Sequence, residues 1–346
     1  MNGKERVVTI TKTLAIPRGY KSMLNLIETE MAISAMKDFF EKQLSTALNL
    51  IKVSAPLMIC EGKGINDNLN GVERVVSFDA LDIKNGQIEI VQSLAKWKRM
   101  ALARYGLPVG QGLYTNMNAI RRDELLDNLH SLYVDQWDWE KVISREQRNQ
   151  DTLITEVKKI YSVMKKTEQY MYKYNPILKP ELPEDIYFIT TQDLEARFPK
   201  LTSKQREDAI TKEYGAVFIM QIGIVLRSGE KHDGRSPDYD DWTLNGDILI
   251  WNSILEKAFE VSSMGIRVDE RALLNQLKLS NNEERIMLDY HQALLNGELP
   301  LTIGGGIGQS RLCMYFLKKA HIGEVQASVW NEEIMKECEE SNITLL

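Results

Sequence analysis

The chain has 346 residues and a formal net charge of −6, with 43% hydrophobic and 27% charged residues. This composition is typical of a folded globular protein and excludes a largely disordered one. The acidic balance argues against a large nucleic-acid-binding surface, and no apolar run reaches the length that spans a bilayer, so we expect neither kind of partner.

The first part of the chain is predicted to hold two helices and several short strands. Met36, Phe40 and Leu44 recur at helical spacing and predict an amphipathic helix. Turn residues between two β-like runs predict a hairpin. The elements expected here are a helix over 23–48, a strand over 50–58, β-like runs over 72–78 and 87–92 joined by a turn at 82–86, and a helix over 93–105.

The rest of the chain continues this mixture. Strands with helices between them, but without regular βαβ alternation, favour an α/β (α+β) chain on a mainly antiparallel sheet flanked by helices. Because no repeat or linker interrupts it, we expect one domain over 23–346 after an N-terminal extension over 1–22. The elements expected here are a strand over 130–139, a helix over 146–174, strands over 216–226 and 247–252, and a glycine turn at 304–308 leading into a helix over 309–319.

One predicted strand has an unusual polar face. Gln136, Asp138 and Glu140 alternate with Trp137 and Trp139. Because strand side chains alternate between faces, the three polar groups share one side. Polar groups placed among aromatic residues indicate a ligand-binding platform more than a solvent-exposed surface.

Two segments concentrate charge beside aromatic residues. Residues 237–242 hold three acids beside Tyr239 and Trp242. They form either a solvated turn or a partly buried cluster that faces a cation or ligand. Residues 93–99 place three cations around Trp97, which is also what an ordinary basic helix face looks like.

Cysteines and histidines indicate no metal site. Cys60, Cys313 and Cys338 are too far apart for a disulfide framework or a zinc motif, so we expect a reducing, cytoplasmic environment. The four histidines form no metal-binding pair, and His130 is predicted to be structural.

The glycine-rich segment 304–308 completes neither a dinucleotide fingerprint nor a P-loop. A glycine turn that enters a helix and is followed by Arg311 can still approach a phosphate or purine closely. A plain surface turn is the equally open alternative.

Taken together, these segments resemble the catalytic core of class II aminoacyl-tRNA synthetases. Leu50–Met58 resembles motif 1. Arg121 with Glu124, followed by 136–140, resembles motif 2 of the aspartyl and asparaginyl branch. Residues 304–311 resemble motif 3, although Gln309 and Ser310 stand where an acid commonly precedes the arginine.

A more specific resemblance is to ammonia-dependent asparagine synthetases, the aspartate–ammonia ligases. It implies that ATP activates L-aspartate as β-aspartyl-adenylate with release of pyrophosphate, and that ammonia then gives asparagine and AMP. It also implies Mg²⁺ and a homodimer formed through motif 1. The segments that carry it, in order, are 66–71, 93–99, 133–140, 237–242, 244–247 and 262–267.

The resemblance also implies roles for individual residues. Arg121 would bridge the aspartate carboxylate and the α-phosphate, and Arg311 would contact adenine or the terminal phosphate. Asp67 or Asp240 would accept the proton of ammonium, and the residues alone do not choose between them. The remaining implied residues are Lys98, Ser93, Gln136, Asp138 and Arg267 for aspartate, Ser263 and Asp247 for the nucleotide, and Asp247 and Glu260 for Mg²⁺.

The residues argue against three alternative functions. A tRNA synthetase of the aspartyl branch carries an anticodon-binding module before its core, and about twenty residues are too few for such a barrel. A non-catalytic paralogue would be expected to lose the motif arginines, which are present at 121 and 311. A glutamine-dependent enzyme needs an activated cysteine nucleophile. Residue 2 is Asn, so free ammonia is the expected nitrogen donor.

Overall fold

An eight-stranded sheet forms the centre of the computed structural model, which describes residues 8–10, 14–67 and 73–346. The edge strands β3 and β9 pair in parallel with their neighbours, and all pairings between them are antiparallel. This confirms the predicted mixed fold with a mainly antiparallel sheet. In spatial order the strands are β3 (Leu50–Lys52), β7 (Gly112–Ile120), β8 (Tyr133–Val142), β13 (Thr302–Gly308), β12 (Lys257–Arg267), β11 (Asp240–Asn252), β10 (Ala216–Met220) and β9 (Tyr187–Thr190).

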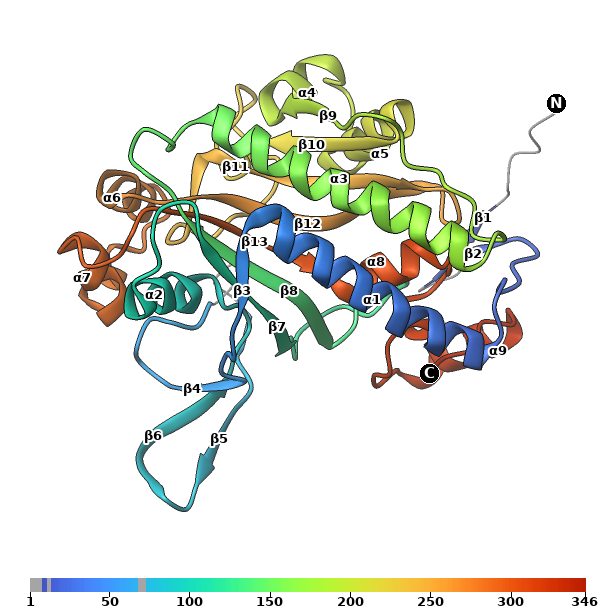
Figure 1. Ribbon diagram of the computed structural model, residues 1–346, viewed down its shortest axis with the longest axis horizontal. Coiled ribbons are helices and arrows are strands. Elements are labelled where there is room, and N and C mark those ends of the chain that lie inside the picture. The colour runs from blue at the N-terminus through green and yellow to red at the C-terminus, as the bar shows by residue number, and fades with distance from the viewer. Residues whose placement is uncertain (1–7, 11–13, 68–72) are drawn as a thin grey trace.

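Two long helices, α1 (Leu26–Leu48) and α3 (Gln150–Tyr174), lie across one face of this sheet (Figure 1). A capping box between Asn25 and Glu28 starts α1, because it satisfies backbone donors that the first turn leaves unpaired. Phe40 from its predicted apolar stripe stacks on Trp137 of β8 with ring centroids 4.6 Å apart. This contact joins the helix layer to the tryptophan face of β8.

The other helices surround the sheet. Helix α2 packs against β7, β8 and β13, and α5 against β10, β11 and β12. Among the described residues, none of the helices is both long and apolar enough to span a membrane. The shorter helices are α2 (Ala95–Tyr105), α4 (Thr191–Arg197), α5 (Ser203–Tyr214), α6 (Glu270–Leu279), η1 (Glu283–Met287), α7 (Asp289–Leu295), α8 (Gln309–Phe316), η2 (Ile322–Glu324) and α9 (Glu332–Glu340).

A small three-stranded sheet projects from the body (Figure 1). It consists of β4 (Met58–Cys60), β6 (Ile83–Ile90) and β5 (Ser77–Ala80). The predicted hairpin is present, although its turn comes earlier than expected because β6 already starts at Ile83. The strand predicted over 50–58 is wrong as one element, since β3 and β4 belong to different sheets. Pro56 lies between them, and proline removes a ladder donor.

The glycine turn predicted at 304–308 is also wrong, because these residues form β13 in the middle of the large sheet. Their lack of side chains serves the neighbouring strands. A Cβ at Gly304 would lie 2.0 Å from Oε2 of Glu140, and one at Gly306 would lie 2.3 Å from Oε1 of Gln136. The glycines therefore leave room for polar side chains of β8.

Part of the predicted N-terminal extension packs on the body. Strands β1 (Val8–Ile10) and β2 (Ala15–Pro17) form an antiparallel pair. The backbone N–H of Ala15 donates to Oδ1 of Asn128 at 2.7 Å, and the Asn128 amide donates back to the Ala15 carbonyl at 3.0 Å. Residues 1–7 and 11–13 lie outside the described residues, and the division into 1–22 and 23–346 stays a prediction.

Candidate active site

A cavity of about 460 Å³ lies over the polar side of β8, β13, β12 and β11. All side chains that sequence reasoning proposed for the site line this one cavity. They are Asp67, Ser93, Lys98, Arg121, Gln136, Asp138, Asp240, Asp247, Glu260, Ser263, Arg267 and Arg311. The fold thus brings together segments that are far apart in the sequence.

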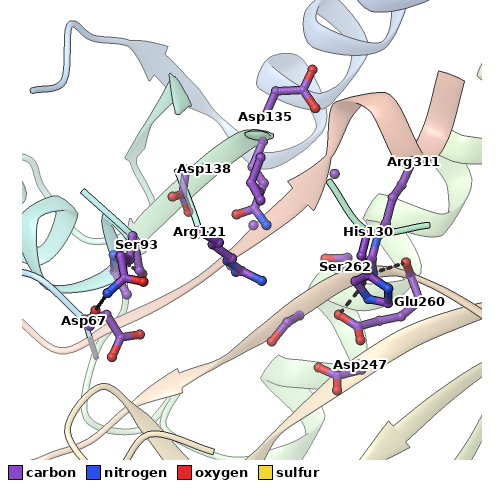
Figure 2. A pocket seen from close by; sticks show the side chains of 18 of the residues that line it. Asp67, Ser93, Arg121, His130, Asp135, Asp138, Asp247, Glu260, Ser262 and Arg311 are labelled. Atoms are coloured by element: carbon purple, nitrogen blue, oxygen red, sulfur yellow. Dashed lines mark hydrogen bonds and ion pairs between the residues drawn. The ribbon is translucent and has the colours of Figure 1, made fainter. Parts of the chain in front are cut away.

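The cavity has two ends (Figure 2). Asp67 and Ser93 lie at one end, and Asp247, Glu260 and Arg311 lie at the other, with the Arg121 side chain between them. A site of this shape can hold one ligand group near Asp67 and another near Arg311.

Strand β8 carries the predicted polar platform. Gln136 and Asp138 line the cavity, whereas Trp137 and Trp139 are fully buried in the hydrophobic core. Glu140, the third member of the platform, is also completely buried. The alternation read from the sequence is therefore confirmed.

Lys98 of α2 contacts this platform and is itself buried. Its Nζ donates to Asp138, to the carbonyl of Trp139 at 3.0 Å and to the carbonyl of Gly305 at 3.1 Å. An ammonium group has three N–H donors, so all of them are used. A substrate carboxylate that bound to Lys98 would replace one of these acceptors.

Arg267 of β12 forms the central ion-pair network under the cavity. Its Nε and Nη2 donate to the two oxygens of Glu140 at 2.9 and 2.7 Å, and its Nη1 donates to Asp240. Burial acts to raise the pKa of Glu140, but Arg267 and then Lys98 outweigh it and hold this pKa below its usual value. The network stays charged and rigid, which fixes the strands that form the cavity floor.

Arg121 and Arg311, predicted from the sequence to be the motif arginines, both line the cavity. The nearest carboxylate to the Arg121 guanidinium is that of Glu124, at 3.7 Å. Within the described part of the chain, Nε of Arg121 is buried and has no hydrogen-bond partner. Arg311 donates to the carbonyl of Glu260 at 2.9 Å and remains 23% exposed. Both arginines can therefore bind an anion.

Two carboxylates share the far end of the cavity. Burial raises the pKa of Asp247 to about 6; Glu260 adds to this rise and Arg235 opposes it. Among the described residues there is no group of three or more potential metal-binding side chains. Asp247 and Glu260 could hold a divalent cation only together with oxygens from a ligand such as a phosphate.

A protein-family model described as aspartate–ammonia ligase matches residues 27–342. This chain belongs to the aspartate–ammonia ligase family. The aspartate–ammonia ligase of Clostridium tetani is 61% identical over 98% of this chain and 99% of its own length. That of Clostridium perfringens strain 13 is 62% identical over 96% of this chain and 99% of its own length.

Solved structures place the aspartate–ammonia ligase fold among class II tRNA synthetases. One is asparaginyl-tRNA synthetase from Pyrococcus horikoshii, complexed with asparaginyl-adenylate. The match covers 88% of this chain and 70% of the synthetase chain, with a TM-score of 0.64. The Entamoeba histolytica enzyme, also with asparaginyl-adenylate, matches 87% and 66% with a TM-score of 0.62. Both are 15% identical to this chain, so the likeness establishes the fold.

Arg235 is a site residue that sequence reasoning missed. Its Nη2 donates to Asp247 at 2.7 Å, its Nη1 donates to Ser263, and its Nε lies 3.8 Å from Asp240. A single arginine in a loop carries no motif signal, although Arg235 lies two residues before the acidic segment 237–242. His130, predicted to be structural, also lines the cavity (Figure 2), and its Nδ1 lies 2.9 Å from Oδ1 of Asp127.

Proposed function

We propose that this aspartate–ammonia ligase makes L-asparagine in two steps that share the cavity. In the first step, a β-carboxylate oxygen of aspartate attacks the α-phosphorus of ATP, and pyrophosphate leaves. In the second, ammonia attacks the β-carbonyl carbon, the bond to AMP breaks, and one proton is passed on. One observation carries this proposal: arginines and carboxylates line the same cavity. The arginines can bind the phosphate and carboxylate groups of the substrates, and the carboxylates can bind their ammonium groups.

Arg121 is proposed to act on the first step. Its position between the two ends of the cavity supports a bridge from the aspartate carboxylate to the α-phosphate (Figure 2). A planar guanidinium can donate to two oxygens at once. Negative charge moves between these oxygens as the adenylate forms, so Arg121 would stabilise the transition state.

The aspartate is proposed to bind at the end near β8. Asp138 and Gln136 would hold its α-amino group, with Ser93 beside them, and Lys98 would hold its side-chain carboxylate. Arg267 would fix this pocket through Glu140. The polar side chains of β8 that line the cavity support this assignment, because Lys98 lines the same cavity and donates to Asp138.

Asp67 is the proposed proton acceptor for ammonium. Asp240, the other candidate, accepts from Arg267 and faces Arg235, and two cations repel a third. Asp67 is buried at the opposite end from Arg311 and lines the same cavity. A carboxylate there can attract ammonium and take its proton as the nitrogen attacks.

ATP is proposed to lie toward Arg311 and Ser263, with Mg²⁺ held by Asp247 and Glu260. The two carboxylates fit this ion because their mutual repulsion would be relieved by a divalent cation. When bound, Mg²⁺ would neutralise charge on the phosphates. Arg235 would keep Asp247 oriented toward the nucleotide.

We also propose a homodimer in the cytoplasm. Helix α1, next to the motif 1 strand β3, exposes Leu26, Ile27 and Met31. An apolar patch of this kind suits contact with a second copy. Light scattering at micromolar concentration should give twice the chain mass; a monomer would contradict the dimer. Cys60, Cys313 and Cys338 are free thiols, which suits a reducing compartment.

Pyrophosphate exchange tests the proposed function against a tRNA-charging one. Purified protein should exchange labelled pyrophosphate into ATP when aspartate is present and ammonia is absent. Adding ammonium should yield free asparagine, and adding tRNA should change neither rate. Exchange that needs tRNA, or aspartate transfer to tRNA, would favour a synthetase instead.

A further inference from the structure

Helix α2 carries three cations whose heads are all buried, and each has a different task. Lys98 contacts Asp138, as described above, and Arg99 donates to the carbonyls of Pro300 and Val268 at 2.8 and 2.7 Å. Lys96 points elsewhere and has no place in the proposed mechanism. Its side chain is only 4% exposed, so its charge must be matched within the protein.

The partner of Lys96 is the fully buried carboxylate of Asp238, at 3.0 Å. Asp238 also accepts from Ser236 at 2.8 Å and Arg285 at 3.1 Å, and Nε2 of His291 lies 3.1 Å away. These donors come from several separate segments of the chain. These contacts hold the Asp238 carboxylate in place, two residues before Asp240 of the cavity.

Lys96 makes a second contact that links this carboxylate to the candidate proton acceptor. Its Nζ donates to the carbonyl of Asn66 at 3.1 Å. The side-chain oxygen of Asn66 accepts from the backbone N–H of Asp67 at 3.0 Å and of Gln92 at 2.9 Å. Gln92 in turn donates to the Asp67 carbonyl at 3.1 Å. Both the N–H and the carbonyl of Asp67 are thus hydrogen-bonded, and Lys96 links the segment 66–67 to Asp238.

We propose that Lys96 is a positioning residue for the ammonia step. By joining Asn66 to Asp238, it sets where the Asp67 carboxylate stands in the cavity. The inference rests on the proposed function, in which Asp67 takes the proton of ammonium. Adenylate formation depends on Arg121 and the nucleotide end, which Lys96 does not touch, so the two half-reactions should respond differently to its loss.

The test variant is Lys96→Met, which keeps the length of the side chain and removes its donors. Asp238 still has Arg285, His291 and Ser236, so its carboxylate stays paired. We expect aspartate-dependent pyrophosphate exchange within threefold of the wild-type rate, together with a fall of about tenfold or more in kcat/KM for ammonium. Misplacement of a reacting group by about 1 Å has effects of this size or larger.

The direction of the change in ammonium kinetics distinguishes a positioning role of Lys96 from a purely electrostatic one. Removing a cation near the ammonium site would, by charge alone, favour ammonium and lower its KM. The matched control is Arg285→Met, which removes a cation from the same Asp238 carboxylate; among the described residues, Arg285 makes no hydrogen bond to Asn66. We expect Arg285→Met to keep both half-reactions near wild type. Equal losses in Lys96→Met and Arg285→Met would overturn the proposal, as would equal losses in the two half-reactions of Lys96→Met.

A second variant decides the matter if Lys96→Met does not fold. Asn66→Ala leaves Lys96 and Asp238 paired and removes the oxygen that holds Asp67 N–H. The same selective loss of ammonium use is expected, and unchanged ammonium kinetics would refute the positioning link. Wild-type protein without any ammonia-dependent asparagine synthesis would refute the proposed function instead, so the two failures are distinguishable.

Discussion

Gly304 and Glu140 face each other across β13 and β8 with no room for a methyl group between them. A Cβ at position 304 would lie 2.0 Å from Oε2 of Glu140. That oxygen accepts from Nη2 of Arg267 at 2.7 Å and lies 3.8 Å from Nζ of Lys98. The close approach lets a completely buried carboxylate hold two cations beneath the cavity, which makes this glycine a packing requirement of the site.

The first prediction compares alanine at two glycines of β13. Gly304→Ala should lower the free energy of unfolding by about 3 kcal/mol, the upper end for overpacking, because Glu140 is locked by Arg267. A Cβ at position 306 would lie 2.3 Å from Oε1 of Gln136, which is the end of a more flexible side chain. Gly306→Ala should fold normally and raise KM for aspartate instead. Urea unfolding and aspartate kinetics on both variants check this, and similar stabilities would contradict it.

The second prediction concerns Arg121→Lys. Lysine keeps the charge but loses the planar pair of donors, so the swap is not conservative at a bridging site. We expect kcat to fall by about 10²-fold, equivalent to roughly 3 kcal/mol, with little change in folding because the side chain faces the cavity. Aspartate-dependent pyrophosphate exchange by thermally intact protein measures it. Activity within threefold of wild type would remove Arg121 from the site.

The third prediction concerns Lys98→Ala. The variant should weaken aspartate binding more than ATP binding, because Lys98 lies on the β8 side of the cavity. It also leaves the carboxylate of Asp138 buried without its lysine, so we expect a loss of about 3–5 kcal/mol in unfolding free energy. Separate KM values for aspartate and ATP, with a denaturation curve, test both parts. Equal rises in the two KM values would argue against the aspartate assignment.

The fourth prediction is a pH effect on stability at His321. Burial lowers the pKa of this imidazole to about 4, and its Nδ1 accepts from the N–H of Gly323 at 3.0 Å. Between about pH 4 and 6.5 the unfolded chain binds more protons at this residue, so its contribution to stability falls as the pH falls through that range. From pH 7 to pH 5 the loss should be about 2 kcal/mol.

The variant His321→Asn isolates this contribution, since asparagine supplies an acceptor near the position of Nδ1 and does not titrate. It should be less stable than wild type at pH 7, and the difference should shrink at pH 5. Unfolding free energies measured at both pH values decide it, and a difference that stays constant would show that His321 is not the group responsible.

The sequence predicted best where the pattern is local. The stripe on α1 and the alternation along β8 follow from helical and strand periodicity, and both are present. The glycines of β13 were wrongly predicted to form a turn. Glycine is needed at these positions because the side chains of Glu140 and Gln136 lie close to them, and those two residues come from a distant part of the chain. Lys96 and Arg99 looked like an ordinary basic face for the same reason: composition shows the charge and not its buried partner.

This aspartate–ammonia ligase is expected to make asparagine from aspartate and free ammonia, with cleavage of ATP to AMP. Incubation with ¹⁵N-ammonium chloride, L-aspartate, ATP and Mg²⁺, followed by NMR and nucleotide chromatography, tests it most directly. We expect ¹⁵N-asparagine, AMP and pyrophosphate in equal amounts, and no asparagine when ammonia-free glutamine replaces ammonium. ADP and phosphate as products, or equal asparagine formation from glutamine, would contradict the account.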